Sequence, residues 1–391
     1  MLKEVNGVET PPSDTNLYSL EEISLHLGDL VVKHPKQKVW LFKVNHNVDG
    51  RGIMRLILNE STLPCYNWFQ AQVSKFGEQW KFPWAHESAL NRLLSELKEV
   101  IKSHSVCMFN DMIKQEKMYP QWDDFSKDVK KYGCIVQAEA LDADKLQVTA
   151  ISADVFIKPG KKMRYKILCT GDQIHARDHL QHWGSTVPQS SLEDDELEEK
   201  IFKIVEKLWE KEVFGHVTLS FLTYFDDNDE QITWSFDVKL GLSDQLAFYN
   251  IGKYLAFQDN DVWDAEGLSM SLCPRMIHTN LSCVHYSVLF QMLRAYAVGW
   301  DAKRHQGCLL ALMDPLQRDN LGIISISREG LAKSLSGLAR AMAVIAKEIS
   351  SPSMKGETDF FKAINEIDTI LVSMKEYEEE ERLRRTQMLI P

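Results

Sequence analysis

Hydrophobic and polar positions alternate along this chain with two different periods, and each period predicts one kind of element. Apolar residues that recur every three or four positions predict helices over the ranges 20–34, 87–103, 193–212, 280–299, 328–349 and 358–386. Short apolar runs predict strands over the ranges 39–44, 133–141, 146–157, 163–170, 216–225, 232–240, 307–313 and 321–327. The chain therefore mixes helices with strands throughout its length.

Local signals mark several ends of these elements. Ser19 and Glu22 are spaced as a capping box before the first helical pattern, and Pro35 predicts where that helix ends. The turn-forming run Lys158–Lys162 separates two strand patterns, which predicts an antiparallel hairpin. The polar residues 1–17 predict a flexible lead-in, and residues 350–391 predict a linker followed by a solvated helical tail.

The stretch Val39–Ile53, "VWLFKVNHNVDGRGI", places Lys43 inside an apolar run and then opens into glycines. A lysine in such a run needs a partner, and an anionic phosphate is one. Gly50 and Gly52 would let backbone N–H groups approach phosphate oxygens closely. The alternative is a strand lysine that extends to solvent, followed by an ordinary turn. The stretch matches neither a Walker A loop nor a dinucleotide-binding fingerprint.

Two late strands carry the candidate metal ligands. Magnesium prefers oxygen ligands, usually one or two carboxylates completed by phosphate. Asp237 is the one carboxylate within these two strand patterns, where Ser220 is a weak ligand and Lys239 would repel the ion. His175, His179 and His182 are spaced to share a helical face, but a loop is expected there, which argues against a transition-metal site.

Composition excludes several classes of protein. The chain has 391 residues and a net charge of −11, which disfavours non-specific binding to nucleic acid. It has no apolar run long enough to cross a membrane and no secretory signal, so neither a membrane nor secretion is expected. The seven cysteines are dispersed and form no Cys-x-x-Cys pair, which predicts reduced thiols and a cytoplasmic location.

Several of these pieces occur in an order that resembles an ATP-grasp fold. The best-matching stretches are "VWLFKVNHNVDGRGI", "TGDQIHA" with the later "WGSTVP", and "GHVTLSFL" followed by "WSFDVKLGLS". Together they resemble the carboxylate-amine-ligase-like region of the IQ motif-containing protein H family. The resemblance implies an α+β fold with two subdomains around a cleft, over residues 18–140 and 141–276. Residues 277–349 would form an added helical and strand layer.

The resemblance also implies roles for individual residues. Lys43 corresponds to the lysine that contacts nucleotide phosphate, and Gly50, Arg51 and Gly52 to the flexible loop over the phosphates. The hinge strand beside the adenine would carry Glu139 and Leu141. Asp237 corresponds to a magnesium-binding carboxylate, so the implied cofactors are ATP and Mg²⁺.

The sequence departs from the family pattern where ligase chemistry would occur. Catalytic members have an acid at the position of Ser220, and they have Glu-x-Asn followed by arginine where this chain has Asp237-Val-Lys239. We therefore assign no catalytic residue. The first hypothesis is a degenerate ATP-grasp module with a regulatory or partner-binding role. The alternatives are an active ATP-dependent ligase with altered metal ligation, and an interaction protein without nucleotide.

The family also bears on partners and tissue. Its association with male germ cells implies a role in spermatogenesis, with protein partners that the sequence does not identify. No Ile-Gln-x-x-x-Arg pattern occurs in these residues, so calmodulin binding would require an IQ segment that this chain lacks.

Overall fold

The computed structural model describes residues 1–48, 51–108, 122–139, 148–175, 182–225, 230–256, 268–313, 316, 318–350 and 356–388. The chain divides into two compact units, each built from separated segments. The first unit comprises Met1–Val8, Thr149–Thr223 and Asp237–Pro391, and the second comprises Glu9–Val148 and Tyr224–Phe236. The predicted subdomain 18–140 thus lies in the second unit, whereas the predicted layer 277–349 shares the first unit with residues 149–223.

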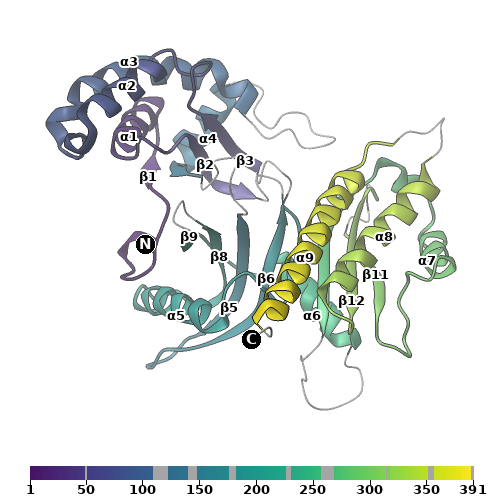
Figure 1. Ribbon diagram of the computed structural model, residues 1–391. Coiled ribbons are helices and arrows are strands. Elements are labelled where there is room, and N and C mark those ends of the chain that lie inside the picture. Colours follow the sequence, from purple (N-terminus) through teal and green to yellow (C-terminus); the bar gives the residue numbers. More distant parts are fainter. Residues whose placement is uncertain are drawn as a thin grey trace. The chain divides into compact units, whose positions relative to one another are not determined.

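A four-stranded antiparallel sheet is the centre of the second unit, with strand order β1-β4-β2-β3 (Figure 1). Its strands are β1 (Ser13–Leu17), β2 (Val39–Val48), β3 (Arg51–Ile57) and β4 (Cys134–Ala138). Its helices are α1 (Leu20–Lys33), α2 (Tyr66–Phe76), the 3₁₀ helix η2 (Gly77–Lys81), α3 (Pro83–Met108) and α4 (Trp122–Tyr132). Contacts of α1, α3 and α4 with the strands enclose one hydrophobic core.

The capping box of α1 forms as the sequence predicts. The Ser19 hydroxyl accepts a hydrogen bond from the backbone N–H of Glu22 at 3.1 Å, and the Glu22 carboxylate accepts one from the Tyr18 N–H at 2.6 Å. Gly28 lies where α1 packs on α3, and a Cβ there would lie 2.9 Å from Cδ2 of Leu94, so that side chain would have to shift. The first helix is therefore fixed at its N-terminus and along its packed face.

The structure replaces the predicted flexible lead-in with ordered elements. Residues Leu2–Glu4 form the 3₁₀ helix η1, and Val5 and Val8 are buried. Further on, β1 pairs with β4 through its backbone. The sequence of β1 is polar, so its place in the sheet depends on backbone pairing that an apolar pattern does not reveal.

The first unit is organised around a sheet with strand order β11-β12-β10-β7-β6-β5-β8-β9. The last residues of β8 and the first residues of β9 are assigned to the second unit. Its strands are β5 (Thr149–Lys158), β6 (Arg164–His175), β7 (His182–Val187), β8 (Gly215–Phe225), β9 (Gln231–Leu240), β10 (Ser269–Ile277), β11 (Gly307–Leu312) and β12 (Asn320–Ser327). Its helices are α5 (Asp194–Glu210), α6 (Asp244–Ala256), η3 (Thr279–Cys283), α7 (Tyr286–Ala295), α8 (Leu331–Ile349) and α9 (Phe360–Met388). The predicted hairpin is confirmed as the antiparallel pair of β5 and β6.

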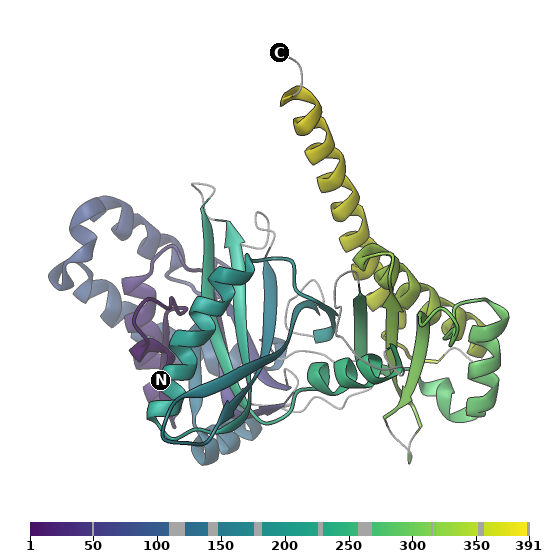
Figure 2. The same cartoon turned by 90° about the horizontal axis from the view of Figure 1, so that it is seen from below.

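Helix α9 is packed only along its first part. Phe360, Ala363 and Ile367 are buried against α8, whereas Tyr377 and Leu383 are largely exposed. Figure 2 shows the helix extending away from the rest of the first unit. The predicted solvated tail is therefore the second half of a helix whose first half belongs to a hydrophobic core.

Six cysteines have described side chains, and all six are free thiols. Five of them are buried, and Cys283 is exposed. Cys134, Cys169 and Cys308 are among the buried ones, and the Cys107 side chain lies outside the described residues. Within the described part of the chain, each helix is too short or too polar to cross a membrane.

Candidate functional site

One face of the four-stranded sheet is apolar, and the opposite face carries charged and amide side chains among apolar ones. Strand residues alternate between faces, and the register of β2, β3 and β4 sets which side chains share a face. The first face is buried in the core under the helices and includes Trp40, Phe42, Val44, Met54, Leu56, Cys134 and Val136. The second face carries Lys43, Arg55, Gln137 and, directly after β4, Glu139, together with Val39, Leu41, Ile53 and Ile135. We call this second face the polar face, and it is the candidate site of the second unit.

Glu139 forms a buried ion pair on this face. Its Oε2 lies 2.7 Å from Nε of Arg55, and the two side chains are 7% and 17% exposed. The Gln37 amide donates hydrogen bonds to the backbone carbonyls of both Val39 and Glu139, at 2.7 and 2.6 Å. Glu139 is therefore fixed through both its backbone and its carboxylate. Arg55 was missed by the sequence reasoning, since its role depends on the register between β3 and β4.

Lys43 lies half-buried on the same face, between Ile53 of β3 and Ile135 of β4. Its ammonium nitrogen is 5.2 Å from the centroid of the Phe236 ring, so the aromatic face stabilises the charge. Gln137 donates a hydrogen bond to the Phe236 carbonyl at 3.3 Å, which ties this part of β9 to the sheet. The lysine thus has a defined position beside other polar groups.

The segment after Lys43 continues into a second strand. Val48 of β2 is paired with Arg51 of β3, so Arg51 and Gly52 begin a strand rather than lying in a loop. Gly50 and Leu141, two of the predicted nucleotide contacts, lie outside the described residues. Lys43 and Gly52 therefore lie on the two paired strands of one hairpin.

Asp237 lies on β9 and is assigned to the first unit. Its carboxylate accepts a hydrogen bond from the Val238 N–H at 2.9 Å, and its Oδ2 is 3.9 Å from Nζ of Lys239. The two side chains are 39% and 57% exposed. Ser220 on β8 is 5% exposed and opposite Ser152 of β5. An ammonium thus lies beside the one carboxylate that the sequence offers for magnesium.

The donor set does not fit a bound magnesium ion. Among the described residues, no group of three or more His, Cys, Asp or Glu side chains is placed to hold a metal. His175 and His182 end β6 and begin β7, with ring centroids 5.5 Å apart, so they share a hairpin and not a helical face. His179 lies outside the described residues.

The first unit holds a buried carboxylate that sequence reasoning missed. Asp154 on β5 is 1% exposed and accepts hydrogen bonds from Thr218 at 2.8 Å, Gln245 at 3.1 Å and the Cys169 thiol at 3.4 Å. Burial, and next the negative charge of Asp154, raise the pKa of Cys169, which keeps this thiol protonated. The cluster ties α6 to β5, β6 and β8, and we assign it a structural role.

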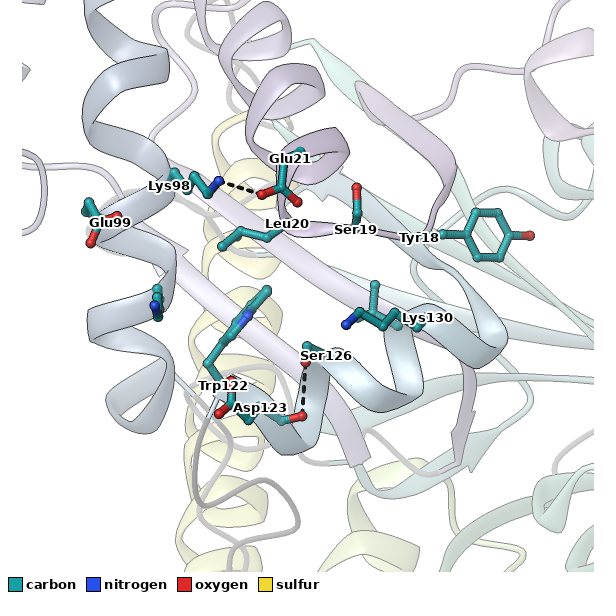
Figure 3. A pocket seen from close by; sticks show the side chains of 12 residues that line it. Tyr18, Ser19, Leu20, Glu21, Lys98, Glu99, Trp122, Asp123, Ser126 and Lys130 are labelled. Atoms are coloured by element: carbon teal, nitrogen blue, oxygen red, sulfur yellow. Dashed lines mark hydrogen bonds and ion pairs between the residues drawn. The ribbon is translucent and has the colours of Figure 1, made fainter.

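A pocket of about 340 Å³ opens in the second unit between the N-terminus of α1, α3 and α4 (Figure 3). Its charged lining consists of Glu21, Glu99 and Asp123 with Lys98, Lys102 and Lys130. The charges balance, and Lys98 is already paired with Glu21 at 2.5 Å. This pocket therefore offers no excess charge for a phosphate.

The architecture is that of an ATP-grasp protein. The biotin carboxylase domain of 2-oxoglutarate carboxylase from Hydrogenobacter thermophilus, solved with MgADP, matches with a TM-score of 0.51 at 12% identity, covering 94% of this chain and 67% of that one. A biotin carboxylase from Campylobacter jejuni matches with a TM-score of 0.47 at 11% identity, covering 93% of this chain and 67% of that one. These matches concern the fold alone.

The chain belongs to the family described as IQCH-like, ATP-grasp, whose sequence model matches residues 2–262. The IQ motif-containing protein H of Danio rerio is 29% identical over 378 residues. That match covers 93% of this chain but 34% of the zebrafish protein, so the chain spans about a third of its relative. The resemblance stated from the sequence is thereby confirmed.

Proposed function

We propose that this chain is an ATP-grasp module that binds a nucleotide at the polar face of its four-stranded sheet and acts in regulation or partner binding. The observation that carries the proposal is the β2–β3 hairpin, which holds the half-buried Lys43 on the polar face beside Phe236. A lysine ammonium is one of the groups that recognise phosphate oxygens in proteins. The ADP-bound biotin carboxylase of similar fold is consistent with a nucleotide as ligand.

The proposal omits ligase chemistry because the metal ligands do not fit. Acyl-phosphate formation needs a Lewis acid that draws charge from the transferred phosphoryl group. Asp237 is a single, half-exposed carboxylate with the Lys239 ammonium 3.9 Å away. An ammonium provides no coordination positions for phosphoryl oxygens, so the proposal includes nucleotide binding without phosphoryl transfer.

The test is a calorimetric titration of the full chain with ATP, in Mg²⁺ and in EDTA. We expect heat of binding in both buffers, and loss of that heat in Lys43→Ala. Lys36→Ala is the matched control, because Lys36 is an exposed lysine in the turn before β2. The absence of heat with the wild-type chain would reject nucleotide binding and favour an interaction protein without nucleotide.

A separate assay addresses the ligase alternative. ADP release is measured with Mg²⁺ or Mn²⁺ in the presence of mixed carboxylic acids, amines and thiols. We expect no release above the Lys43→Ala background. Release that depends on a carboxylate and on an amine or thiol would show that ligation occurs with altered metal ligation.

We place the module in spermatogenesis on the basis of the family resemblance alone. Enrichment of the transcript in testis over other tissues, and a germ-cell defect after its deletion, are the expected results. Protein partners of the module are sought with the full-length protein, because this chain covers a third of its relative.

A further inference from the structure

A second pocket lies in the first unit, within the layer formed by residues 297–340. It has a volume of about 320 Å³ and is lined by the connection between α7 and β11, the end of β12 and the first half of α8. None of its residues belongs to the polar face described above. A pocket of this volume accommodates a small molecule.

The charges around this pocket do not balance. Arg304, Lys333 and Arg340 line it together with two acids, Asp301 and Glu329. Arg304 Nε lies 3.7 Å from Asp301, and Lys333 Nζ lies 4.0 Å from Glu329, each between exposed side chains. Ion pairs of this length and exposure are weak and easily exchanged for another anion. The lining of the pocket therefore has a net positive charge, although the net charge of the whole chain is −11.

Asp301, the acid paired with Arg304, already accepts hydrogen bonds from the backbone. The Asp301 carboxylate accepts hydrogen bonds from the N–H groups of Lys303 at 2.9 Å and Arg304 at 3.3 Å. These bonds, the one from Lys303 first, lower the pKa of Asp301. Asp301 therefore acts mainly to fix the turn that presents Arg304.

Arg340 adds a planar guanidinium from α8. One of its terminal nitrogens donates to the Tyr296 carbonyl at 2.9 Å, which orients the group and leaves further N–H donors for a ligand. A guanidinium fork recognises carboxylate and phosphate oxygens in pairs. Arg340 and Arg304 approach the pocket from different elements, so they can contact one ligand together.

Small residues and hydroxyls line the rest of the wall together with Val298, Gln306, Cys308 and Ile326. A Cβ at Gly337 would lie 2.7 Å from Oγ of Ser325, and one at Gly307 would lie 2.5 Å from the Gly299 carbonyl oxygen. Both glycines therefore allow neighbouring segments of the wall to pack closely. Burial raises the pKa of Cys308 to about 11, so its thiol adds no negative charge that would repel an anion.

From this arrangement we infer that the pocket between α8 and the α7–β11 connection binds a small oxyanion-bearing molecule through Arg304 and Arg340. The ligand carries a phosphate or a carboxylate, since the guanidinium group recognises both by the same geometry. The site is independent of the nucleotide that we propose for the second unit.

Two titrations with the full Lys43→Ala chain test this inference, one with inorganic phosphate and one with succinate, at constant ionic strength in chloride. The Lys43→Ala background removes the proposed nucleotide site from the readout. We expect saturable heat and a rise in melting temperature with at least one of the two anions, and the anion that binds identifies the ligand chemistry. If neither anion binds more tightly than chloride, the inference is wrong.

Three variants locate the site. Arg304→Gln with Arg340→Gln should weaken binding roughly ten-fold or more, as loss of charge-assisted hydrogen bonds predicts. Ser336→Tyr, at an exposed position in the pocket wall, should block the pocket without changing charge. Arg164→Gln, on the exposed end of the β5–β6 hairpin, removes charge elsewhere and should change affinity by less than about two-fold.

The variants separate specific binding from a general charge effect. An equal loss of affinity in Arg164→Gln and in the double arginine variant would assign the binding to overall charge and overturn the inference. Full anion affinity in Ser336→Tyr would show that the anion does not bind in this pocket, which would also overturn the inference. Far-ultraviolet circular dichroism of each variant checks that the fold is retained.

Discussion

Lys239 places its ammonium nitrogen 3.9 Å from Oδ2 of Asp237, two residues earlier on β9. Side chains at positions i and i+2 of a strand point to the same side, so the lysine is held beside the carboxylate by the strand itself. The pair is partly exposed and adds little stability. Its consequence is chemical, because a positive charge lies where a divalent cation would need negative ligands.

The first prediction concerns this pair. The Asp237 carboxylate should bind a divalent cation weakly in the wild-type chain, because the Lys239 ammonium lies beside it. Lys239→Ala should strengthen that binding several-fold, since Asp237 is then free to contact the metal ion. Calorimetric titrations of wild type and variant with Mg²⁺ measure this effect. Equal affinities would argue against any influence of Lys239 on the carboxylate.

The second prediction concerns the buried ion pair of Arg55 and Glu139. Arg55→Met should destabilise the second unit by about 3 kcal/mol, because it leaves a carboxylate that is 7% exposed without its guanidinium. Adding Glu139→Gln should recover most of that loss. Urea unfolding of the two single variants and the double variant measures the coupling, and additive effects would show that the pair is not coupled.

The third prediction concerns the Asp154 cluster. Asp154→Ala should destabilise the first unit by about 2–4 kcal/mol, because it leaves the buried Thr218 hydroxyl without its acceptor and removes one of the hydrogen bonds of Gln245. Asp154→Asn should have a smaller effect, since its amide oxygen still accepts one of these bonds. Asp195→Ala on the exposed side of α5 is the control. A change as small as that of the control would show that water replaces the lost partner.

The fourth prediction concerns Asp359, which lies just before α9 and is 2% exposed. Burial raises its pKa from 3.8 to about 7, against the opposing effect of a hydrogen bond from the Ile277 N–H. The folded state therefore binds more protons than the unfolded state between about pH 4 and 7. The stability that this carboxyl contributes is present at low pH and is lost as the pH rises through this window.

Asp359→Asn should therefore become more stable relative to wild type as the pH rises from 5 to 8, by an amount on the order of 3 kcal/mol. The amide oxygen preserves the acceptor for Ile277. Buried His278, whose pKa is lowered by burial, is common to both proteins, and its effect cancels in the comparison. Melting curves at each pH test the trend, with exposed Asp368→Asn as the charge control. A difference independent of pH would contradict it.

The sequence reasoning succeeded where the signal is local. The capping box and Pro35 located α1, and the turn run Lys158–Lys162 located the hairpin of β5 and β6. It failed where the local signal is weak or misleading. The strands β1 and β3 were not predicted, because β1 is polar and β3 begins in a glycine-containing segment that resembles a loop. The predicted helix over 280–299 divides into η3 and α7, since the His285 ring accepts the Ser287 N–H at 3.3 Å and caps a new helix.

The candidate site was predictable only in part for the same reason. Lys43 was identified because a charge within an apolar run is conspicuous. Its neighbours Arg55 and Gln137 become visible only once the register of three strands is known. The Asp154 cluster joins four elements, and the proposed oxyanion pocket joins residues that are far apart in the sequence. No sequence spacing records such groupings.

The alternation along β2 also constrains which sequence changes the family can accept. Phe42 is fully buried on one face, and Lys43 lies on the other. A substitution at either position affects one face only. A single-residue insertion or deletion before Phe42 would instead exchange the faces of every following residue in the strand, directing the ammonium into the core and the phenyl ring out of it. We therefore expect homologous chains to vary in side chains along Val39–Val44 while keeping the number of residues in this segment constant.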